Sequence, residues 1–159
     1  MAVARAVVRP AVRGDAPAIA ALLAAGSLAA GAEDPSSPSR YAEAIARIRG
    51  AGGEVYVAEL DGAVVAACQV DCIEHLQHAG GRVAEVESVH VDEGLRGRGI
   101  GAALLEACAA WARAKGCYRV QLTSNGVRRD AHRFYEANGF VASHVGFKRS
   151  LEIDQPSAT

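Results

Sequence analysis

A basic, glycine-rich turn follows a valine-rich stretch near the middle of the chain. It has the spacing Arg96-x-x-Gly99-x-Gly101, and an apolar pattern typical of a helix comes after it. The first turn of a helix exposes backbone N–H groups and the positive end of the helix dipole, and glycines let a diphosphate approach the backbone closely. Arg96 and Arg98 add positive charge. The turn therefore predicts a site for a phosphate-bearing ligand.

Two common phosphate-binding loops do not fit this spacing. A P-loop ends in Gly-Lys-Ser/Thr, but Gly99 is followed here by Ile100 and Gly101, so there is no lysine for a γ-phosphate and no hydroxyl for magnesium. A dinucleotide-binding loop needs a different glycine spacing and an acidic residue roughly 20 positions later. The next expected strand, 118–123, ends in no carboxylate. Nucleoside triphosphates and dinucleotides are therefore disfavoured as ligands.

The elements that must position this turn can be predicted from hydrophobic periodicity and from helix and turn signals. Asp61-Gly62 between two β-branched runs predicts a hairpin. The expected strands are 4–9, 55–60, 64–73, 82–91 and 117–123, with a bent strand or a pair of strands over 140–151. The expected helices begin near residue 15 and span 39–49, 100–115 and 130–138.

The strand that leads into the turn contains a break in its period. Val86 lies on the even phase, whereas Val89 and Val91 lie on the odd phase. Because side chains alternate along a strand, one face can bury all three only if an extra residue is inserted. We therefore predict a β-bulge near Glu87 and Ser88.

Composition limits the classes of function. A chain of 159 residues suits one domain, predicted to span 1–153 with an unpatterned tail at 154–159. The 17 Lys+Arg against 18 Asp+Glu argue against a nucleic-acid binder. No apolar run is long enough for a membrane helix, and the N-terminus does not resemble a signal peptide. Four cysteines without a C-x-x-C pair favour a reducing cytoplasm.

A second motif lies nearer the C-terminus, where Tyr135 precedes Gly139-Phe140 at the end of an expected helix. With the glycine turn, it makes most of the chain resemble the GNAT superfamily of acyl-CoA-dependent N-acyltransferases. The resemblance implies a single domain of α/β (α+β) class. Its central sheet would be mixed, mostly antiparallel, of about six or seven strands splayed at a β-bulge, with about four helices. It also implies acetyl-CoA as cosubstrate, bound at the glycine turn through its pyrophosphate. No metal is expected.

The chemistry of amine acetylation assigns a role to the carboxylates of the bulged strand. An alkylamine has a pKa of about 10.4, so releasing the neutral nucleophile at pH 7 costs about 4.6 kcal/mol. A general base that removes the ammonium proton, directly or through a water molecule, is therefore expected. In the resembling family a glutamate on this strand often takes that role, and Glu87 beside the predicted bulge is the first candidate. Glu85, on the same phase, is the alternative, and either could instead be a solvated carboxylate.

Tyr135 is the second predicted catalytic residue. In the resembling family a tyrosine at this place protonates or hydrogen-bonds the departing thiolate of coenzyme A. Because a phenol has a pKa of about 10 and a thiol about 8.5, stabilisation of the developing thiolate fits at least as well as full proton transfer. The resemblance implies direct attack of the amine on the thioester without a covalent enzyme intermediate.

The resemblance also implies which residues contact coenzyme A. Backbone groups at the bulge, the glycine turn and the start of the last helix share this expected role: Val89, His90, Val91, Arg96, Gly97, Arg98, Gly99, Ile100, Gly101, Asn125, Arg128, Ala131 and Phe134. Arg128 stands where family members often carry asparagine, and Asn125 is a candidate replacement. His75 and His78 could be read as metal ligands, but three apart on a strand end they should face opposite ways, which favours solvated histidines.

The acceptor is indicated only in outline. The region from Leu122 to Phe147 looks like the aminoalkylphosphonate N-acetyltransferases, and Gly116-Cys-Tyr118 resembles glucosamine-phosphate N-acetyltransferases. Both groups acetylate small anionic amines, which the basic segment 128–133 would suit. A protein or peptide acetyltransferase and a non-catalytic coenzyme A-binding module remain as alternatives. Family habit also implies a homodimer through the last strands.

Overall fold

A computed structural model of the protein describes residues 5–151. Contacts divide the chain into two compact units, Met1–Leu122 and Thr123–Thr159. The predicted tail 154–159 lies outside the described residues. No helix in the described part of the chain is long and apolar enough to cross a membrane.

The first unit is built on one mixed sheet. Its order, β1-β2-β3-β4-β5, follows the chain, and the first three pairings are antiparallel whereas β4 and β5 are parallel. The strands are Val7–Pro10 (β1), Glu54–Leu60 (β2), Ala63–Glu74 (β3), Arg82–Val91 (β4) and Cys117–Leu122 (β5). The predicted fold class is confirmed. The expected six or seven strands are not, because residues 5–151 contain five.

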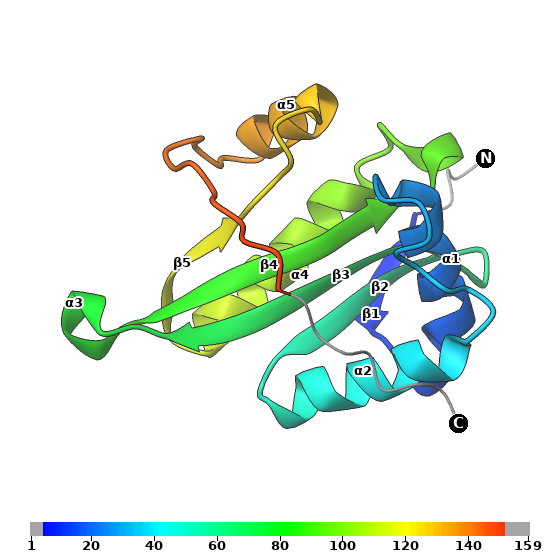
Figure 1. The fold of residues 1–159 in the computed structure, drawn as a ribbon, viewed down its shortest axis with the longest axis horizontal. Helices are drawn as coiled ribbons and strands as arrows, with labels where there is room; N and C mark the ends of the chain where they lie inside the picture. The colour runs from blue at the N-terminus through cyan, green and yellow to red at the C-terminus, as the bar shows by residue number, and fades with distance from the viewer. Residues whose placement is uncertain (1–4, 152–159) are drawn as a thin grey trace. The chain divides into compact units, whose positions relative to one another are not determined.

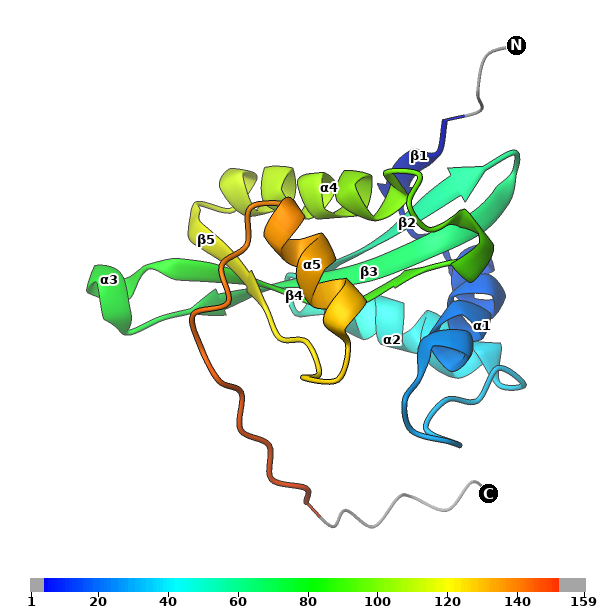
Figure 2. The ribbon, with the colours of Figure 1, turned by 90° about the horizontal axis from the view of Figure 1, so that it is seen from above.

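Helices cover both faces of this sheet (Figure 2). One face packs against α1, Ala16–Gly26, and α2, Pro38–Gly50, around a cluster of buried residues that includes Ile19 of α1, Ile45 of α2 and Ala67 of β3. The other face packs against α4, Ile100–Ala114, where buried Cys108 contacts buried Cys68 of β3. Successive side chains of a strand point to opposite faces, so odd-numbered β3 residues near Ala67 face α1 and α2.

The predicted hairpin is confirmed. Asp61 and Gly62 both adopt positive φ, at 51° and 80°, between β2 and β3. Two left-handed residues in a two-residue loop match the right-handed twist of the flanking strands. The next hairpin, β3–β4, projects beyond the helices and carries at its tip the short α3, Gln77–Gly80 (Figure 1).

The β-bulge is also confirmed. Gln69 of β3 stands opposite Glu87, and Ala67 opposite His90, so Ser88 and Val89 together face the single residue between them. Ser88 has φ 54°, as the inserted residue of a bulge can. The insertion restores Val86 and Val91 to one face, since their partners Val70 and Ala66 are four residues apart. This is why the apolar pattern changes phase.

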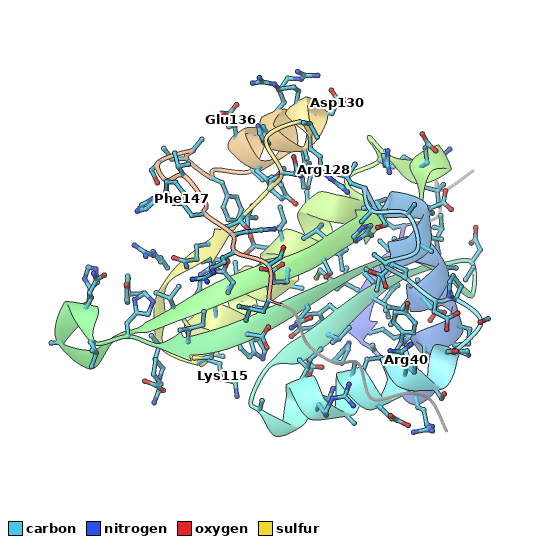
Figure 3. All side chains as sticks on the ribbon, viewed as in Figure 1. Arg40, Lys115, Arg128, Asp130, Glu136 and Phe147 are labelled. Atoms are coloured by element: carbon cyan, nitrogen blue, oxygen red, sulfur yellow. The ribbon has the colours of Figure 1, made fainter. Side chains whose placement is uncertain are left out.

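The second unit contains one helix, α5, Arg129–Ala137, and Gly139 follows it with φ 85°. The strands expected over 140–151 are wrong, since residues 140–151 have no strand. Alternation of apolar and polar residues suggested them, but a strand also needs a partner for its backbone groups. Phe147, labelled in Figure 3, is 93% exposed, and Val141, Val145 and Leu151 are at least 75% exposed.

Near the N-terminus an ion pair joins β1 to the start of α1. Arg9 donates to Asp15 at 2.7 and 3.0 Å, and the backbone N–H of Val12 donates to the same carboxylate at 2.7 Å. The Asp15 side chain is 8% exposed. The hydrogen bond from Arg9 is the main cause that lowers the pKa of Asp15 below its ordinary value, outweighing the effect of burial.

We expect Asp15→Asn to lose about 2 kcal/mol of unfolding free energy at pH 7, because hydrogen bonds to a charged group are lost. A carboxyl whose pKa is lowered on folding contributes stability above its unfolded pKa and loses it as the pH falls. The difference between the wild-type protein and the variant should therefore shrink as the pH falls below the unfolded pKa of about 3.9. Urea unfolding from pH 7 downwards measures it, and a difference that stays constant with pH would contradict the assignment.

Candidate functional site

The glycine turn lies where the sequence placed it, between β4 and α4. Asp92 caps the preceding 3₁₀ turn by accepting a hydrogen bond from the N–H of Gly94 at 2.9 Å. Gly97 and Gly99 have φ 76° and 79°, a backbone region that side chains rarely adopt, and Gly99 is the N-cap of α4. The helical bond from the N–H of Ala103 to the carbonyl of Gly99 is 3.0 Å long. The N–H groups that precede Ala103 in the helix have no intrahelical acceptor.

The turn is exposed to solvent and carries positive charge on two arginine side chains. Arg96, Gly97, Arg98 and Gly99 are all exposed, whereas Ile100 and Gly101 are buried at the first turn of α4. A Cβ added at Gly97 or Gly99 would meet nothing within 4 Å, so the glycines serve the backbone conformation and leave open space above it. Unpaired N–H groups, a helix dipole and two guanidinium groups together can bind a phosphate.

A row of polar side chains crosses the sheet on the face covered by α1 and α2. We call it the polar row, and it consists of Gln69, Asp71, Glu85, Glu87 and Gln121. Directly paired residues share a face, and the registers Gln69↔Glu87, Asp71↔Glu85 and Glu85↔Gln121 link the row across three strands. Its three carboxylates can receive a cationic amine.

Hydrogen bonds join four members of the polar row in two pairs. The amide of Gln121 donates to Glu85 at 2.6 Å, and the amide of Gln69 donates to Asp71 at 2.6 Å. Glu85 is half-buried, whereas Glu87 is exposed. Pairing between β4 and β5 ends at Val86, so Glu87 is the first residue of β4 beyond the point where the two strands separate. The separation leaves backbone groups of β4 without a partner from β5.

The three strand residues predicted to contact a cofactor do not share one face. Val91 stands opposite Ala66 and faces α4, and Val89 lies in the bulge beside Ser88. His90 stands opposite Ala67 and faces α1. Any contact that these residues make in common with one ligand must therefore use their backbone groups.

In the second unit, Tyr135 lies on α5 in an aromatic group. Its ring centroid is 5.2 Å from that of Phe134 and 5.9 Å from that of Phe140. Asn125 accepts a hydrogen bond from the N–H of Val127 at 3.1 Å, which holds the turn before α5. Ala131 is half-buried, as is Arg128 at the N-cap of α5, labelled in Figure 3.

The two loop histidines lie differently from the prediction that they face opposite ways. His75 Nδ1 is 3.0 Å from the hydroxyl of Tyr118, and the ring of His78 lies with its centroid 4.1 Å from that of the same tyrosine. Positive φ at His78 and Ala79, 54° and 55°, turns the second histidine back. No group of three or more His, Cys, Asp or Glu side chains within residues 5–151 is arranged to hold a metal ion.

The sequence reasoning missed most of the polar row. Gln69 and Asp71 interrupt the apolar pattern of β3 at two alternate positions, and Gln121 lies between the apolar residues Val120 and Leu122 of β5. Polar residues with period two inside otherwise apolar strands signal a part of a sheet face that the hydrophobic core does not reach. That signal was available once the faces of β3 and β5 were assigned.

The chain matches known proteins at the level of family and fold. Residues 22–140 match the family model described as the acetyltransferase (GNAT) family. Among solved structures, a protein described as a transcriptional regulator from Bacillus halodurans superposes with a TM-score of 0.86 at 33% identity, covering 92% of this chain and 100% of that one.

Two curated relatives match over shorter segments. An aminoalkylphosphonate N-acetyltransferase from Salmonella typhimurium is 36% identical over 91 residues, which are 57% of this chain and 58% of the relative. A glucosamine 6-phosphate N-acetyltransferase from Trypanosoma brucei brucei is 40% identical over 76 residues, 47% of each chain. The chain thus spans about half the length of the curated relatives it matches.

Proposed function

The chain belongs to the acetyltransferase (GNAT) family, and from this membership we propose that it is an N-acetyltransferase. It transfers the acetyl group of acetyl-CoA directly to the primary amine of a small molecule, within a complex of enzyme and both substrates. The observation that carries this proposal is the arrangement of β4. Its carboxylate Glu87 stands where β5 departs, and its end leads into the glycine turn at the start of α4.

The residues of the turn fit acetyl-CoA. Gly97 and Gly99 hold the backbone in a left-handed conformation with open space at each Cα, and Arg96 and Arg98 supply positive charge for the pyrophosphate. The backbone of Val89, His90 and Val91, beyond the last β5 pairing, is available for the pantetheine amides. Bound acetyl-CoA supplies the activated acyl group.

Direct transfer is supported by the state of the cysteines. A neighbouring thiol, Cys108, and burial raise the pKa of Cys68, and burial together with Cys72 raises the pKa of Cys117 to about 11. A protonated thiol is a poor nucleophile, so neither of these cysteines is suited to carry the acyl group. A cytoplasmic location is part of the proposal, since four cysteines without a C-x-x-C pair favour a reducing compartment.

In this mechanism Glu87 takes the proton of the acceptor ammonium, directly or through water, and the free amine attacks the thioester carbonyl. The hydroxyl of Tyr135 stabilises the thiolate that leaves. Ground-state binding of the ammonium is assisted by the other carboxylates of the polar row, Asp71 and Glu85. If the acceptor is amino acid-like, its anionic group needs a cationic partner on the protein as well.

A cluster of arginines in the second unit supports an acceptor that carries an anionic group. Residues 128–133 contain Arg128, Arg129 and Arg133, of which Arg133 donates to Asp130. The two curated relatives are named for acceptors that combine an amine with a phosphonate or phosphate group. A primary amine with such a group is therefore the proposed acceptor class.

A homodimer is part of the proposal. The segment 140–151 alternates apolar side chains that are exposed in the single chain, and its backbone has the length of a strand without a strand partner in residues 5–151. A second copy can supply that partner. The molar mass of the protein in solution tests this assignment.

The function is tested by thiol release from acetyl-CoA across a panel of acceptors. The panel contains aminoalkylphosphonates, amino-sugar phosphates, polyamines, aminoglycosides, and peptides with free N-termini or lysines. We expect turnover with a small amine that carries a phosphonate or phosphate group. Turnover of peptides alone would replace the proposal with a peptide acetyltransferase, and tight binding of coenzyme A without any turnover would indicate a non-catalytic module.

Replacing Gly99 with alanine should raise the KM for acetyl-CoA about tenfold with little change in kcat. A side chain at φ 79° costs about 1 to 2 kcal/mol, which the turn avoids by changing the backbone that binds the pyrophosphate. Gly116→Ala is the matched control, because Gly116 has φ 73° at the other end of α4 and equal space around it. Equal KM values in the two variants would contradict the role of the turn.

A further inference from the structure

The imidazole of His90 packs against the end of α1. A Cβ built on Gly26, the last residue of that helix, would overlap the Cδ2 atom of His90 and lie 2.6 Å from its Nε2. Positions 26 and 90 are therefore interlocked, and the ring of His90 occupies the space that a side chain at position 26 would need.

This contact explains why residue 26 is glycine. Its φ is not in the left-handed region, so its backbone conformation is open to any residue. Within a helix, alanine is more favourable than glycine by about 1 kcal/mol. The glycine thus lowers the stability of α1 and in return admits the imidazole of His90.

The other ring nitrogen of His90 has an unusual environment. Nδ1 is buried and has no hydrogen-bond partner among the described residues. A buried polar atom without a partner is rare in folded proteins and calls for a water, an ion or a chemical role. A neutral imidazole with Nδ1 as acceptor carries its proton on Nε2. Nε2 lies at the end of α1, where the last carbonyl groups have no intrahelical donor.

His90 and Glu87 lie on the same face of the sheet on either side of the bulge. Their partners on β3, Ala67 and Gln69, are two residues apart, so the side chains share a face at a spacing of about 7 Å along the strand. A single water can bridge the two side chains where each directs a polar atom towards it within hydrogen-bond distance. Both residues lie in the first unit, which makes this relation independent of α5.

We propose that His90 holds, through a bridging water, the proton that the acceptor ammonium gives up, an inference that rests on the proposed function. The N–H bond of the ammonium breaks, Glu87 and the water relay the proton, and a new N–H bond forms at Nδ1. Because Nε2 keeps its proton, the ring becomes an imidazolium at the C-terminal end of α1, where the helix dipole is negative. The second proton, lost after the amine attacks the thioester, leaves with the sulfur of coenzyme A.

The chemical reason for a second group is proton affinity. A carboxyl group has an ordinary pKa of about 4.3 and holds a proton weakly at pH 7, whereas an imidazole, at about 6.5, holds it well enough to complete the transfer. In this arrangement the carboxylate contacts the amine and the imidazole stores the proton. His90 acts through Glu87 and is a positioning and proton-storing residue, since it does not itself touch the acceptor.

The charged groups around His90 favour this role. Glu87 lies on the same face of β4 across the bulge, and Glu85 and Asp71 lie further along that face on β4 and β3. The helix that packs on it, α1, contains no titratable side chain between Ala16 and Gly26. On β3, β4 and α1, the charged side chains that share this face with His90 are therefore carboxylates.

The first test is the pH dependence of kcat in His90→Gln, with the acceptor that the panel identifies. Glutamine keeps polar atoms at the position but cannot store a proton. We expect kcat at pH 7 to fall about 10- to 100-fold with KM for both substrates within twofold. The dependence of kcat on pH should differ from that of the wild-type protein. A kcat within twofold of the wild-type value, or an unchanged pH profile, would overturn the proposal.

The second test moves the ring without changing it. Gly26→Ala should lower kcat at least fivefold, because the new methyl group displaces the imidazole. In a His90→Ala background the same change should alter kcat less than twofold, since the space is vacant. Gly50→Ala is the matched control, because Gly50 ends α2 and a Cβ there meets nothing within 4 Å. Effects of Gly26→Ala that are equal in both backgrounds would overturn the link between the two positions.

A measurement without turnover separates this inference from the proposed function. Nitrogen-15 NMR of the imidazole should show the tautomer with the proton on Nε2 in the neutral ring, and a neutral ring protonated on Nδ1 would overturn the inference. Absence of turnover in the wild-type protein would instead remove the proposed function and this inference with it. A turnover-competent wild-type protein with an equally competent His90→Gln variant would remove this inference alone.

Discussion

Glu87→Gln is expected to lower kcat about a thousandfold at pH 7 while leaving the KM for acetyl-CoA unchanged. Glutamine has the size of glutamate but cannot accept the ammonium proton, and generating the neutral amine at pH 7 costs about 4.6 kcal/mol. The loss should shrink as the pH rises towards 10, because the free acceptor then deprotonates in solution. Steady-state kinetics from pH 7 to pH 10 measures both effects.

Glu85→Gln is the matched control for this variant. Both glutamates belong to the polar row on the same strand, but Glu85 already accepts a hydrogen bond from Gln121 at 2.6 Å. Glutamine can keep a hydrogen bond there, so we expect a kcat less than fivefold lower. A larger loss in Glu85→Gln than in Glu87→Gln would transfer the role of base to Glu85. A loss in Glu87→Gln that persists undiminished at high pH would contradict proton removal as its cause.

Tyr135→Phe is expected to lower kcat about a hundredfold, with KM values for both substrates nearly unchanged. Removing one hydrogen-bond donor from a developing anion costs about two to three orders of magnitude in other enzymes. The phenylalanine ring keeps the aromatic contacts with Phe134 and Phe140, so only the hydroxyl is lost. The defect should be smaller with an acyl thioester whose thiol is more acidic, because its thiolate needs less stabilisation.

Tyr118→Phe provides the control for a lost hydroxyl. Tyr118 lies on β5 and its hydroxyl is 3.0 Å from Nδ1 of His75 at the tip of the β3–β4 hairpin. No step of the proposed reaction uses it, and we expect kcat within twofold of the wild-type value. If Tyr135→Phe has no greater effect than Tyr118→Phe, or if its defect is the same for every thioester, Tyr135 does not act on the leaving group.

Local signals predicted most of the first unit. Each of three signals predicts one local conformation that the structure contains. The Asp61-Gly62 turn predicts a hairpin, and the phase change around Val86 and Val89 predicts a β-bulge. The glycine turn predicts the start of α4. The segment 140–151 shows where such signals stop. Its alternation describes a strand, but whether a strand forms depends on a partner elsewhere, which no pattern inside the segment can specify.

The candidate site was predictable to a similar extent. The glycine turn and Glu87 could be proposed as site residues because their types match the chemistry of phosphate and ammonium. The interlocked pair of Gly26 and His90 could not, since the two residues are far apart in the chain and neither is unusual in its own segment. Nor could the pairing of Glu85 with Gln121, which depends on the parallel register between β4 and β5.

The contact between Gly26 and His90 also constrains how the sequence can change over evolutionary time. A larger residue at position 26 is tolerated only after position 90 has become small. If the larger residue arises while His90 is still present, the two side chains occupy the same space. The two positions should consequently behave as a single inherited unit. Lineages that abandon the histidine are free to replace the glycine with a better helix former, and those that keep the histidine are not.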